Sequence, residues 1–249
     1  MTENIKSTYS DGILCLQIHR PEKRNAITPV MYASLAQSLT QADTDEKVKV
    51  VVLHGTDSCF TSGNDLNTFR SGPTPDKLYP HNIFLTALSR VRKPVLAAVN
   101  GPALGIGTIM LLHCDLVYAA DDVRFSFPFI NLGLSPEGGT SYLLPRLAGN
   151  RKAMEMVLFG EPFGVDEAMD VDLINEIVTE QSVLDRVMQR AETLAGRSPD
   201  AVQAAKQLMK RGTADAIALA MSRERDVFSE RLASAEAQSA ISGFLNRKS

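Results

Sequence analysis

The first 180 residues alternate between short apolar runs and polar turns. Four runs are bounded by polar residues and are too short for ordinary helices, so they predict strands. Their ranges are 13–18, 48–53, 91–99 and 116–120. The run at 48–53 is almost entirely β-branched, which is typical of a strand buried on both faces. A helix is predicted to begin at Thr28 and Pro29, because a hydroxyl group caps a helix and proline needs no N–H there.

After about residue 180 the strand signals stop and helical spacing takes over. Four successive helices are predicted, at 183–195, 199–210, 214–228 and 233–245. The fold class is therefore α/β, with a core at residues 1–195 and a helical C-terminal region at residues 196–249. A polar stretch after the 48–53 strand predicts a mobile loop. Its breakers are Gly72, Pro73, Pro75 and Pro80.

Composition excludes several classes of function. The 249 residues carry a net charge of −3 and 44% are hydrophobic, which is enough for one sizeable core. Without a basic excess, we expect no nucleic acid and no membrane as partner. The chain has no secretory signal and no apolar run long enough for a bilayer, so we expect a cytoplasmic protein. Cys15, Cys59 and Cys114 lack metal-site spacing, so we expect reduced thiols and no metal.

Two glycine-containing segments follow predicted strands, at residues 59–66 and 100–107. Glycine lets main-chain N–H groups approach a ligand closely, and a helix that begins there adds a positive dipole end. Two such loops on neighbouring strands can aim two N–H groups at one oxygen, which makes an oxyanion hole. Ordinary strand-to-helix turns have the same pattern, so the residues alone leave both interpretations open.

Taken in order, these segments resemble the crotonase family of coenzyme A thioester enzymes. Residues 60–66 (FTSGNDL) are similar to its FxxGxDL element, and residues 93–101 (KPVLAAVNG) to its KPVIAAVNG strand and turn. Residues 20–26 (RPEKRNA) resemble the family's opening, and residues 105–115 its next helix and acidic residue. The resemblance implies a spiral core of repeated ββα units with a helical C-terminal region.

The resemblance also implies the binding site. The oxyanion donors would be the main-chain N–H groups of Asn64 and Ile106, which would bind the thioester carbonyl oxygen. Further substrate contacts are expected from side chains and main chain nearby. They are Arg24, Ser62, Gly63, Asp65, Leu66, Ile109 and Phe129. Coenzyme A would enter as part of an acyl-CoA substrate, so no separate cofactor is expected.

Two positions indicate which reaction of the family is expected. The hydratases use two glutamates, and the aligned positions here are Ile109 and Phe129, which can neither activate water nor donate a proton. Glu137 lies in the sequence Ser-Pro-Glu-Gly, which resembles the catalytic-base element of the peroxisomal type of Δ3,Δ2-enoyl-CoA isomerases. One base suffices to move a proton from C2 to C4 through a dienolate, so Glu137 is expected to be the catalytic base. An isomerase of this type is expected to act in fatty acid metabolism.

Other interpretations stay open. Ser135, Pro136 and Glu137 also form a standard helix start, with a cap, a proline and an acid in the first turn. The chain can also be another crotonase-type enzyme (a hydratase, a dienoyl isomerase, a hydrolase or a lyase) or a non-catalytic acyl-CoA binder. Asn82 is placed in a loop and would assist the base. Strand-end or surface roles are expected for the four histidines, His19, His54, His81 and His113.

Assembly and the nucleotide end of the substrate come from the same resemblance. A homotrimer or dimer of trimers is expected, with contacts from the helices of residues 196–249. Arg24 and the tail at residues 244–248, which includes Arg247 and Lys248, would suit the adenine and phosphates, although the tail can also be a frayed terminus. The last residues do not form a usual peroxisomal tripeptide. The loop at residues 69–82 is expected to shape the acyl pocket.

Overall fold

The central sheet of the computed structural model orders its strands β1-β2-β3-β4-β6-β8 among the residues it describes, which are 2–70, 72–73 and 79–246. β1 and β2 are antiparallel, and the other neighbours are parallel. The strands are β1 (Ile5–Ser10), β2 (Ile13–Ile18), β3 (Val50–His54), β4 (Val95–Val99), β6 (Leu116–Ala120) and β8 (Glu176–Val178). The four strands expected from the sequence are present, which confirms the α/β class.

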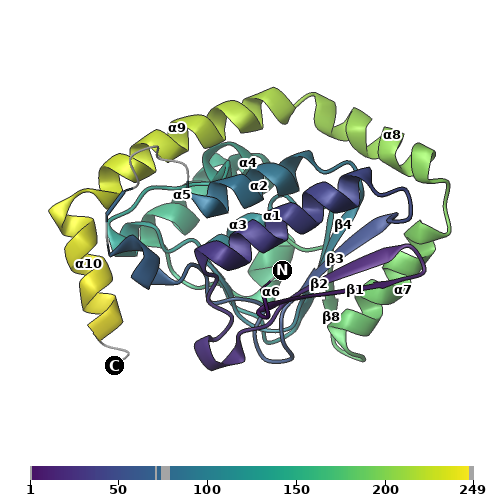
Figure 1. Cartoon of the computed structure of the whole chain (residues 1–249). Coiled ribbons are helices and arrows are strands. Elements are labelled where there is room, and N and C mark those ends of the chain that lie inside the picture. The colour runs from purple at the N-terminus through teal and green to yellow at the C-terminus, as the bar shows by residue number, and fades with distance from the viewer. Residues whose placement is uncertain (1, 71, 74–78, 247–249) are drawn as a thin grey trace.

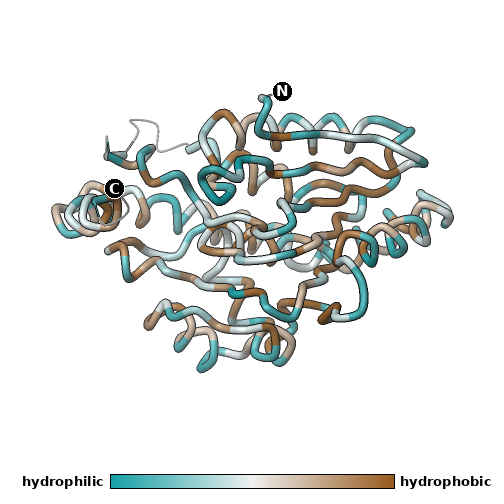
Figure 2. Tube along the Cα trace, turned by 90° about the horizontal axis from the view of Figure 1, so that it is seen from below, coloured by the Kyte–Doolittle hydropathy of each residue, from teal (hydrophilic) through white to brown (hydrophobic). Residues whose placement is uncertain are grey.

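Both faces of this sheet are buried. Along β3, Val50 and Val52 pack in one apolar cluster with α7 (Val183–Ala195), whereas Val51 and Leu53 belong to the main core on the opposite face. Side chains of a strand alternate between faces, so burial on both sides explains the continuous apolar run. Figure 2 shows hydrophobic positions along these neighbouring strands.

The main core lies between the sheet and three helices. They are α1 (Pro29–Thr44), α2 (Pro80–Arg90) and α3 (Ile106–Leu111). The helix start at Thr28 and Pro29 is confirmed, because the Thr28 side chain accepts a hydrogen bond from Met31 N. The prediction that Asn82 lies in a loop is wrong: Asn82 is in α2, which Pro80 begins at a position where proline needs no N–H. The loop prediction at Pro75 lies outside the described residues.

A second, small sheet joins the segments after the main strands. It pairs β5 (Ala103–Leu104) with β7 (Phe125–Ser126) in parallel, and Thr61 forms an isolated bridge with Ala103. Three short 3₁₀ segments lie around it. They are η1 (Pro21–Lys23), η2 (Leu66–Phe69) and η3 (Ile130–Leu132). The carboxyl ends of β3 and β4 therefore lead into chain segments that are held side by side.

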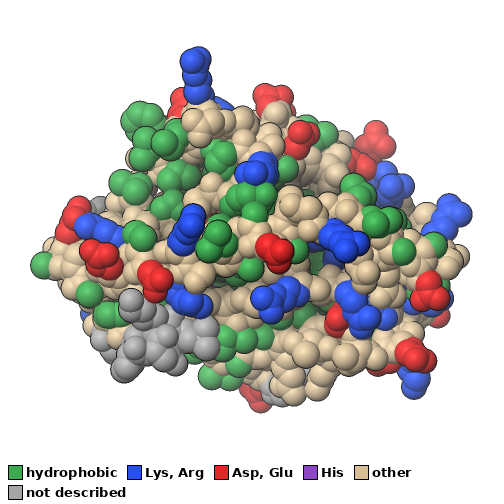
Figure 3. All heavy atoms as spheres, turned by 90° about the horizontal axis from the view of Figure 1, so that it is seen from above, with side chains coloured by type: hydrophobic (Ala, Val, Ile, Leu, Met, Phe, Trp, Pro, Cys, Tyr) green, Lys and Arg blue, Asp and Glu red, His purple; other side chains and the backbone are tan. Residues whose placement is uncertain are grey.

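Helices cover the rest of the molecule. They are α4 (Thr140–Ala148), α5 (Asn150–Phe159), α6 (Val165–Asp170), α8 (Pro199–Arg211), α9 (Ala214–Leu232) and α10 (Ala235–Asn246). Figure 1 shows α8 and α9 running over the top, from the side of α7 to the opposite side, where α10 descends. Charged side chains of both signs are interspersed with hydrophobic ones on this face (Figure 3). Among the described residues, no helix is both long and apolar enough to cross a membrane.

Candidate active site

The two glycine loops form one structure. Thr61 N donates to Pro102 O at 3.1 Å, and Leu104 N donates to Thr61 O at 3.0 Å, so the two segments run side by side like strands. Thr61 is fully buried, and its hydroxyl donates to Asn25 O at 2.7 Å. The spacing of the two loops is therefore fixed by main-chain hydrogen bonds, as the oxyanion-hole interpretation requires.

The glycines at these loops permit the close approach. Gly63 has a φ of 100°, and a Cβ there would lie 2.9 Å from Leu104 O. A Cβ on Gly107 would lie 2.6 Å from the Thr61 side chain. Neither contact is tolerable for a larger residue without movement of one loop. The two segments thus pack at a distance that only glycine allows.

The main-chain N–H groups of Asn64 and Ile106 are available to a ligand. Within the described part of the chain, neither amide donates a hydrogen bond, although the amides on both sides of Asn64 do. Ile106 opens α3, where the first N–H groups have no partner in the helix and the dipole is positive. Both residues line one cavity of about 1090 Å³. Two free donors at one cavity have the character of an oxyanion hole.

The predicted substrate contacts divide into two groups. Ser62, Gly63, Asp65, Leu66 and Phe129 line the same cavity as the two amides. Ile109 and Arg24 are not among the lining residues. Ile109 is fully buried in α3. Its side chain packs against the turn that follows Glu137, since a Cβ added to Gly138 would lie 2.5 Å from it.

Cations lie at the cavity, though not at the predicted position. Arg24 is exposed, and the lining cations are instead Arg20, Lys23 and Arg70. Arg20 also pairs with Asp65 at 2.8 Å. Burial raises the pKa of Asp65, but hydrogen bonds from Arg20 and Asn67 outweigh that effect and hold the pKa below its usual value. Asp65 thus caps η2 and anchors the loop.

The C-terminal helix completes the cavity. Phe244, Leu245 and Asn246 are among its lining residues, as are Ser239 and Ala240 of α10. The predicted nucleotide contacts of Arg247 and Lys248 lie outside the described residues.

Glu137 reaches the cavity from a turn and not from a helix. The helix-start interpretation is wrong, because α4 begins at Thr140, with Gly139 as the residue before it. Gly138 and Gly139 both have positive φ angles, of 71° and 82°, which turn the chain before the helix. Glu137 is 3% exposed and lines the cavity that Asn64 and Ile106 share.

The main chain of this turn is held by hydrogen bonds. Thr140 Oγ1 donates to Glu137 O at 2.6 Å, and His113 Nε2 lies 2.6 Å from Gly138 O. Glu224 of α9 accepts from Gly139 N at 2.5 Å and from Ser141 N at 2.7 Å, so it caps α4 in place of the predicted residues. These contacts come from α4, from α9 and from the segment after α3, and they fix the position of the main chain at Glu137.

The interpretation of His81 as a surface or strand-end residue is wrong. His81 is 3% exposed, and its Nε2 lies 2.7 Å from Glu137 Oε2. The only sequence signal was its position after Pro80, which places it in the first turn of α2 but does not say which side chain it faces. His113 is likewise buried, whereas the other histidines are not.

The charge of Glu137 contributes to the pKa shifts of two further groups. Burial raises the pKa of Tyr32 well above its usual value, and the Glu137 charge adds to the effect. The Tyr32 hydroxyl donates to Asn64 Oδ1 at 2.6 Å, which links α1 to the loop of the oxyanion hole. Burial also raises the pKa of Glu224, with a smaller contribution from Glu137. Tyr32 and Glu224 were not found from the sequence, because their roles depend on helices packing across the site.

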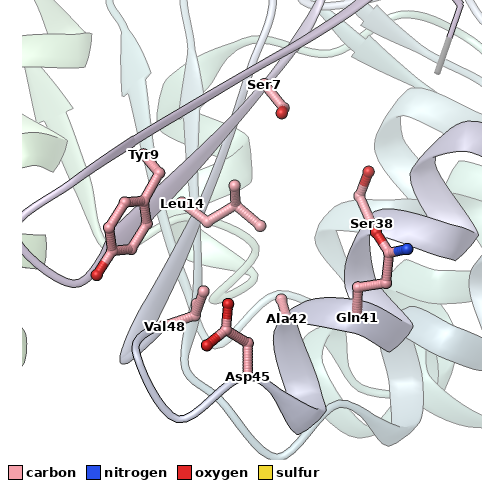
Figure 4. Close-up of a pocket in the computed structure, with 8 residues that line it drawn as sticks. All are labelled: Ser7, Tyr9, Leu14, Ser38, Gln41, Ala42, Asp45 and Val48. Atoms are coloured by element: carbon pink, nitrogen blue, oxygen red, sulfur yellow. The ribbon is translucent and has the colours of Figure 1, made fainter.

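Asp115 and the three cysteines lie outside the cavity lining. Asp115 accepts from Val95 N and from Lys206 Nζ, and so ties α8 to the sheet. Cys15, Cys59 and Cys114 are free thiols. No cluster of three metal-binding side chains is found in the part of the chain that the structure describes. A second hollow, of about 160 Å³, lies between the β1–β2 hairpin and α1 and shares no lining residue with the large cavity (Figure 4).

Comparisons with known proteins show the family of the chain. The family model for enoyl-CoA hydratase/isomerase matches residues 8–249. Enoyl-CoA delta isomerase 2 of Homo sapiens is 33% identical over 99% of the chain, which spans 64% of that relative's length. The 1,2-epoxyphenylacetyl-CoA isomerase of Escherichia coli (strain K12) is 33% identical over all of the chain and 98% of its own. The 2,3-dehydroadipyl-CoA hydratase of the same organism is 34% identical, over 95% of the chain and 93% of its own.

Solved structures match over the whole fold. The structure of Pseudomonas aeruginosa OdaA superposes with a TM-score of 0.95 at 41% identity, and the match covers 99% of this chain and 100% of that one. The crystal structure of an enoyl-CoA hydratase/isomerase from Pseudoalteromonas atlantica T6c gives 0.92 at 33% identity and covers 98% of both chains. The chain belongs to the enoyl-CoA hydratase/isomerase family and has the α/β crotonase fold of a crotonase-type acyl-CoA enzyme.

Proposed function

We propose that the protein is a Δ3,Δ2-enoyl-CoA isomerase, with Glu137 as its base. The observation that carries this proposal is the composition of the cavity. Its lining includes two carboxylates, of which Asp65 is paired with Arg20 and Glu137 is buried without a Lys or Arg partner among the described residues. Glu137 shares the cavity with the two free amides of Asn64 and Ile106.

One carboxylate and two amides suffice for this reaction. The C2 proton of a 3-enoyl thioester is acidified by the carbonyl group and by the adjacent double bond. Glu137 takes this proton, and the electron pair of the C–H bond delocalises into a dienolate whose charge lies on the thioester oxygen. The N–H groups of Asn64 and Ile106 stabilise that oxygen as its charge grows. Return of the proton to C4 forms the 2-enoyl thioester and restores the carboxylate.

The surroundings of the base support isomerisation over hydration. A hydratase needs a water molecule and two groups that exchange protons with it. Phe129 is 5% exposed and Ile109 is fully buried, so the positions of the two hydratase glutamates hold apolar side chains. Phe127 stacks beside Phe129 at 6.4 Å between ring centroids and supports that ring, but of these three apolar residues only Phe129 lines the cavity. Neither hydratase position therefore offers the cavity a carboxylate that could activate water.

Replacement of Glu137 by Gln tests this function. Gln keeps the size of the side chain but cannot accept a proton, so Glu137→Gln is expected to lower kcat for 3-hexenoyl-CoA isomerisation by at least about 10³-fold. Binding of a saturated acyl-CoA, measured by calorimetry, should stay within about threefold of wild type because the cavity is unchanged. Near-normal turnover by the variant would refute the assignment of the base.

A panel of thioesters separates the isomerase from its relatives. Wild-type protein is incubated with 3-enoyl, 2-enoyl, dienoyl and saturated CoA thioesters, and the products are identified by mass spectrometry and by co-elution with 2-enoyl and 3-enoyl standards. Conversion of the 3-enoyl thioester into its 2-enoyl isomer supports the proposal, whereas migration in the dienoyl thioester alone identifies a dienoyl isomerase. A gain of 18 mass units from the 2-enoyl substrate identifies a hydratase, loss of the acyl group a hydrolase, and binding without turnover an acyl-CoA binder.

A further inference from the structure

His81 lies in direct contact with the proposed base. Its Nε2 is 2.7 Å from Glu137 Oε2, and the two side chains are 3% and 4% exposed. Within the described residues, neither atom has a partner that meets the full geometric requirements of a hydrogen bond, so the pair is defined by its distance. Catalytic hydrogen bonds are often poorly aligned in a site without substrate. Two buried polar atoms this close have only each other to replace water.

Aromatic rings hold the imidazole of His81 in place. Tyr79 stacks on it at 5.2 Å with an interplanar angle of 15°. Phe69, Phe228 and Tyr32 meet it edge-on, at centroid distances of 6.1 Å, 6.0 Å and 5.9 Å. These rings come from η2, from α9 and from α1. An imidazole packed on several sides has little freedom to rotate, so the position of its Nε2 is defined.

Three other polar groups near Glu137 have partners of their own. The Tyr32 hydroxyl donates to Asn64 Oδ1 at 2.6 Å. The two oxygens of Glu224 accept from Gly139 N and Ser141 N. His113 Nε2 lies at Gly138 O, on the main chain of the turn. Ser135 Oγ and Asn82 Oδ1 are also buried without a hydrogen-bond partner, but His81 Nε2 is the polar side-chain atom that the structure places within 2.7 Å of Glu137 Oε2.

We propose that His81 is a positioning residue for the base. The imidazole, with a proton on Nε2, donates to Glu137 Oε2 and fixes the plane of the carboxylate, which leaves Oε1 free to take the C2 proton. His81 keeps its own proton throughout, so the transferred proton moves only between C2, Glu137 and C4. This inference rests on the proposed function, because it assigns a role toward the same base.

Two substitutions at His81 separate hydrogen bonding from packing and from titration. His81→Gln keeps an N–H donor near the position of Nε2 but has no ionisable group. His81→Leu has a similar volume and no donor. Because misplacement of a reacting group by about 1 Å costs about 100-fold, we expect His81→Leu to lower kcat by about 100-fold with KM changed less than about threefold. His81→Gln is expected to recover kcat to within about tenfold of wild type.

Both variants need evidence that they fold. Thermal unfolding and calorimetric binding of a saturated acyl-CoA should be equal for His81→Gln and His81→Leu. With that established, a His81→Leu variant with wild-type kcat would overturn the proposal. A His81→Gln variant as inactive as His81→Leu would also overturn it, because the reaction would then require a histidine that exchanges its proton.

A measurement that needs no turnover tests the role of His81 separately from the proposed isomerase activity. The nitrogen-15 NMR shifts of the His81 ring report which nitrogen carries the proton. We expect a ring with a proton on Nε2, and a changed Nε2 shift in Glu137→Gln. A ring protonated only on Nδ1 overturns the positioning role even in an active isomerase. An Nε2–H ring in a protein that isomerises no thioester would refute the proposed function but retain the contact.

Discussion

At the scale of single residues, His113 combines complete burial with a hydrogen bond to the turn that carries Glu137. Burial, together with the nearby Lys210 charge, lowers its pKa to about 4, although the hydrogen bond to Gly138 O opposes the shift. In the folded protein the ring therefore stays neutral well below the usual pKa of histidine. The unfolded chain takes up a proton near pH 6.5, so this residue makes folding depend on pH.

His113 should make the protein less stable as the pH falls from 7 to 5. Its contribution is complete above about pH 6.5 and is lost toward pH 4, since the unfolded state binds the proton first. The free energy of unfolding should decrease by about 2 kcal/mol at pH 5 from this residue alone. Urea unfolding at both pH values measures it. In His113→Gln the decrease should be smaller by a similar amount, and an equal decrease in both proteins would contradict the assignment.

At the scale of elements, the Gly138 turn brings Glu137 to the cavity. Gly138 has a φ of 71°, and a Cβ there would lie 2.5 Å from Ile109 Cγ2 and 2.7 Å from Leu85 Cδ1. Leu85 belongs to α2 and Ile109 to α3, so the turn is pressed against two helices. The position of the base thus depends on the absence of a side chain next to it.

Gly138→Ala should therefore displace Glu137. The left-handed conformation and the overpacking together should lower the free energy of unfolding by roughly 2–4 kcal/mol, and isomerase kcat should fall by at least about tenfold. Gly139→Ala is the matched control. Gly139 has a φ of 82°, but an added Cβ would meet its neighbours at no less than 3.5 Å. That variant should lose only about 1–2 kcal/mol and keep its kcat. Equal losses of activity in both variants would contradict the prediction, because the left-handed backbone conformation, and not the contact with Ile109 and Leu85, would then determine kcat.

The elements with a regular pattern could be predicted from the sequence. Helix α7 has the predicted bounds, and β2 and β6 match their apolar runs, because burial there follows one simple period. Strand β1 was missed because it is exposed on the sheet edge, with one buried side chain, Ile5. The turn at Asp11 and Gly12, both with positive φ, was the available signal for that hairpin.

The site could be predicted only as far as local sequence determines it. The loops of Asn64 and Ile106 are set by glycines near them in the chain, and both reach the cavity as expected. His81 was misjudged because its contact with Glu137 joins helix α2 to a turn far along the chain. The start of α4 was misplaced because Glu224, far along the chain, supplies the cap that Ser135 was expected to give.

At the scale of the whole molecule, distant parts of the chain form one cavity and one core. Arg20 and Lys23 line the cavity together with Phe244 and Leu245. The main core includes Phe228 of α9 and further residues of α10. The core at 1–195 and the helical region at 196–249 remain predictions as separate units, and the C-terminal helices contribute to the same site as the first strands.

Several large apolar side chains are exposed on the surface of the single chain. On α5, Met154, Leu158 and Phe159 are 53%, 57% and 64% exposed, and Leu147 of α4 is 37% exposed. The contiguous helices α4 and α5 thus present large hydrophobic groups on the outside. Exposed apolar groups gathered on one region are typical of a surface that another protein covers.

We propose that this surface joins copies of the chain into a homotrimer or a dimer of trimers. Analytical ultracentrifugation should then give three or six times the chain mass of 27.1 kDa. The double variant Leu158→Asp and Phe159→Asp should sediment as a smaller species, because charges at a buried contact remain without partners. The double variant Leu208→Asp and Met209→Asp on α8 tests the alternative contact expected from residues 196–249, because these side chains are 71% and 84% exposed and the helix has no buried residue. A wild-type monomer, or dissociation of the α8 variant alone, would refute the α4–α5 interface.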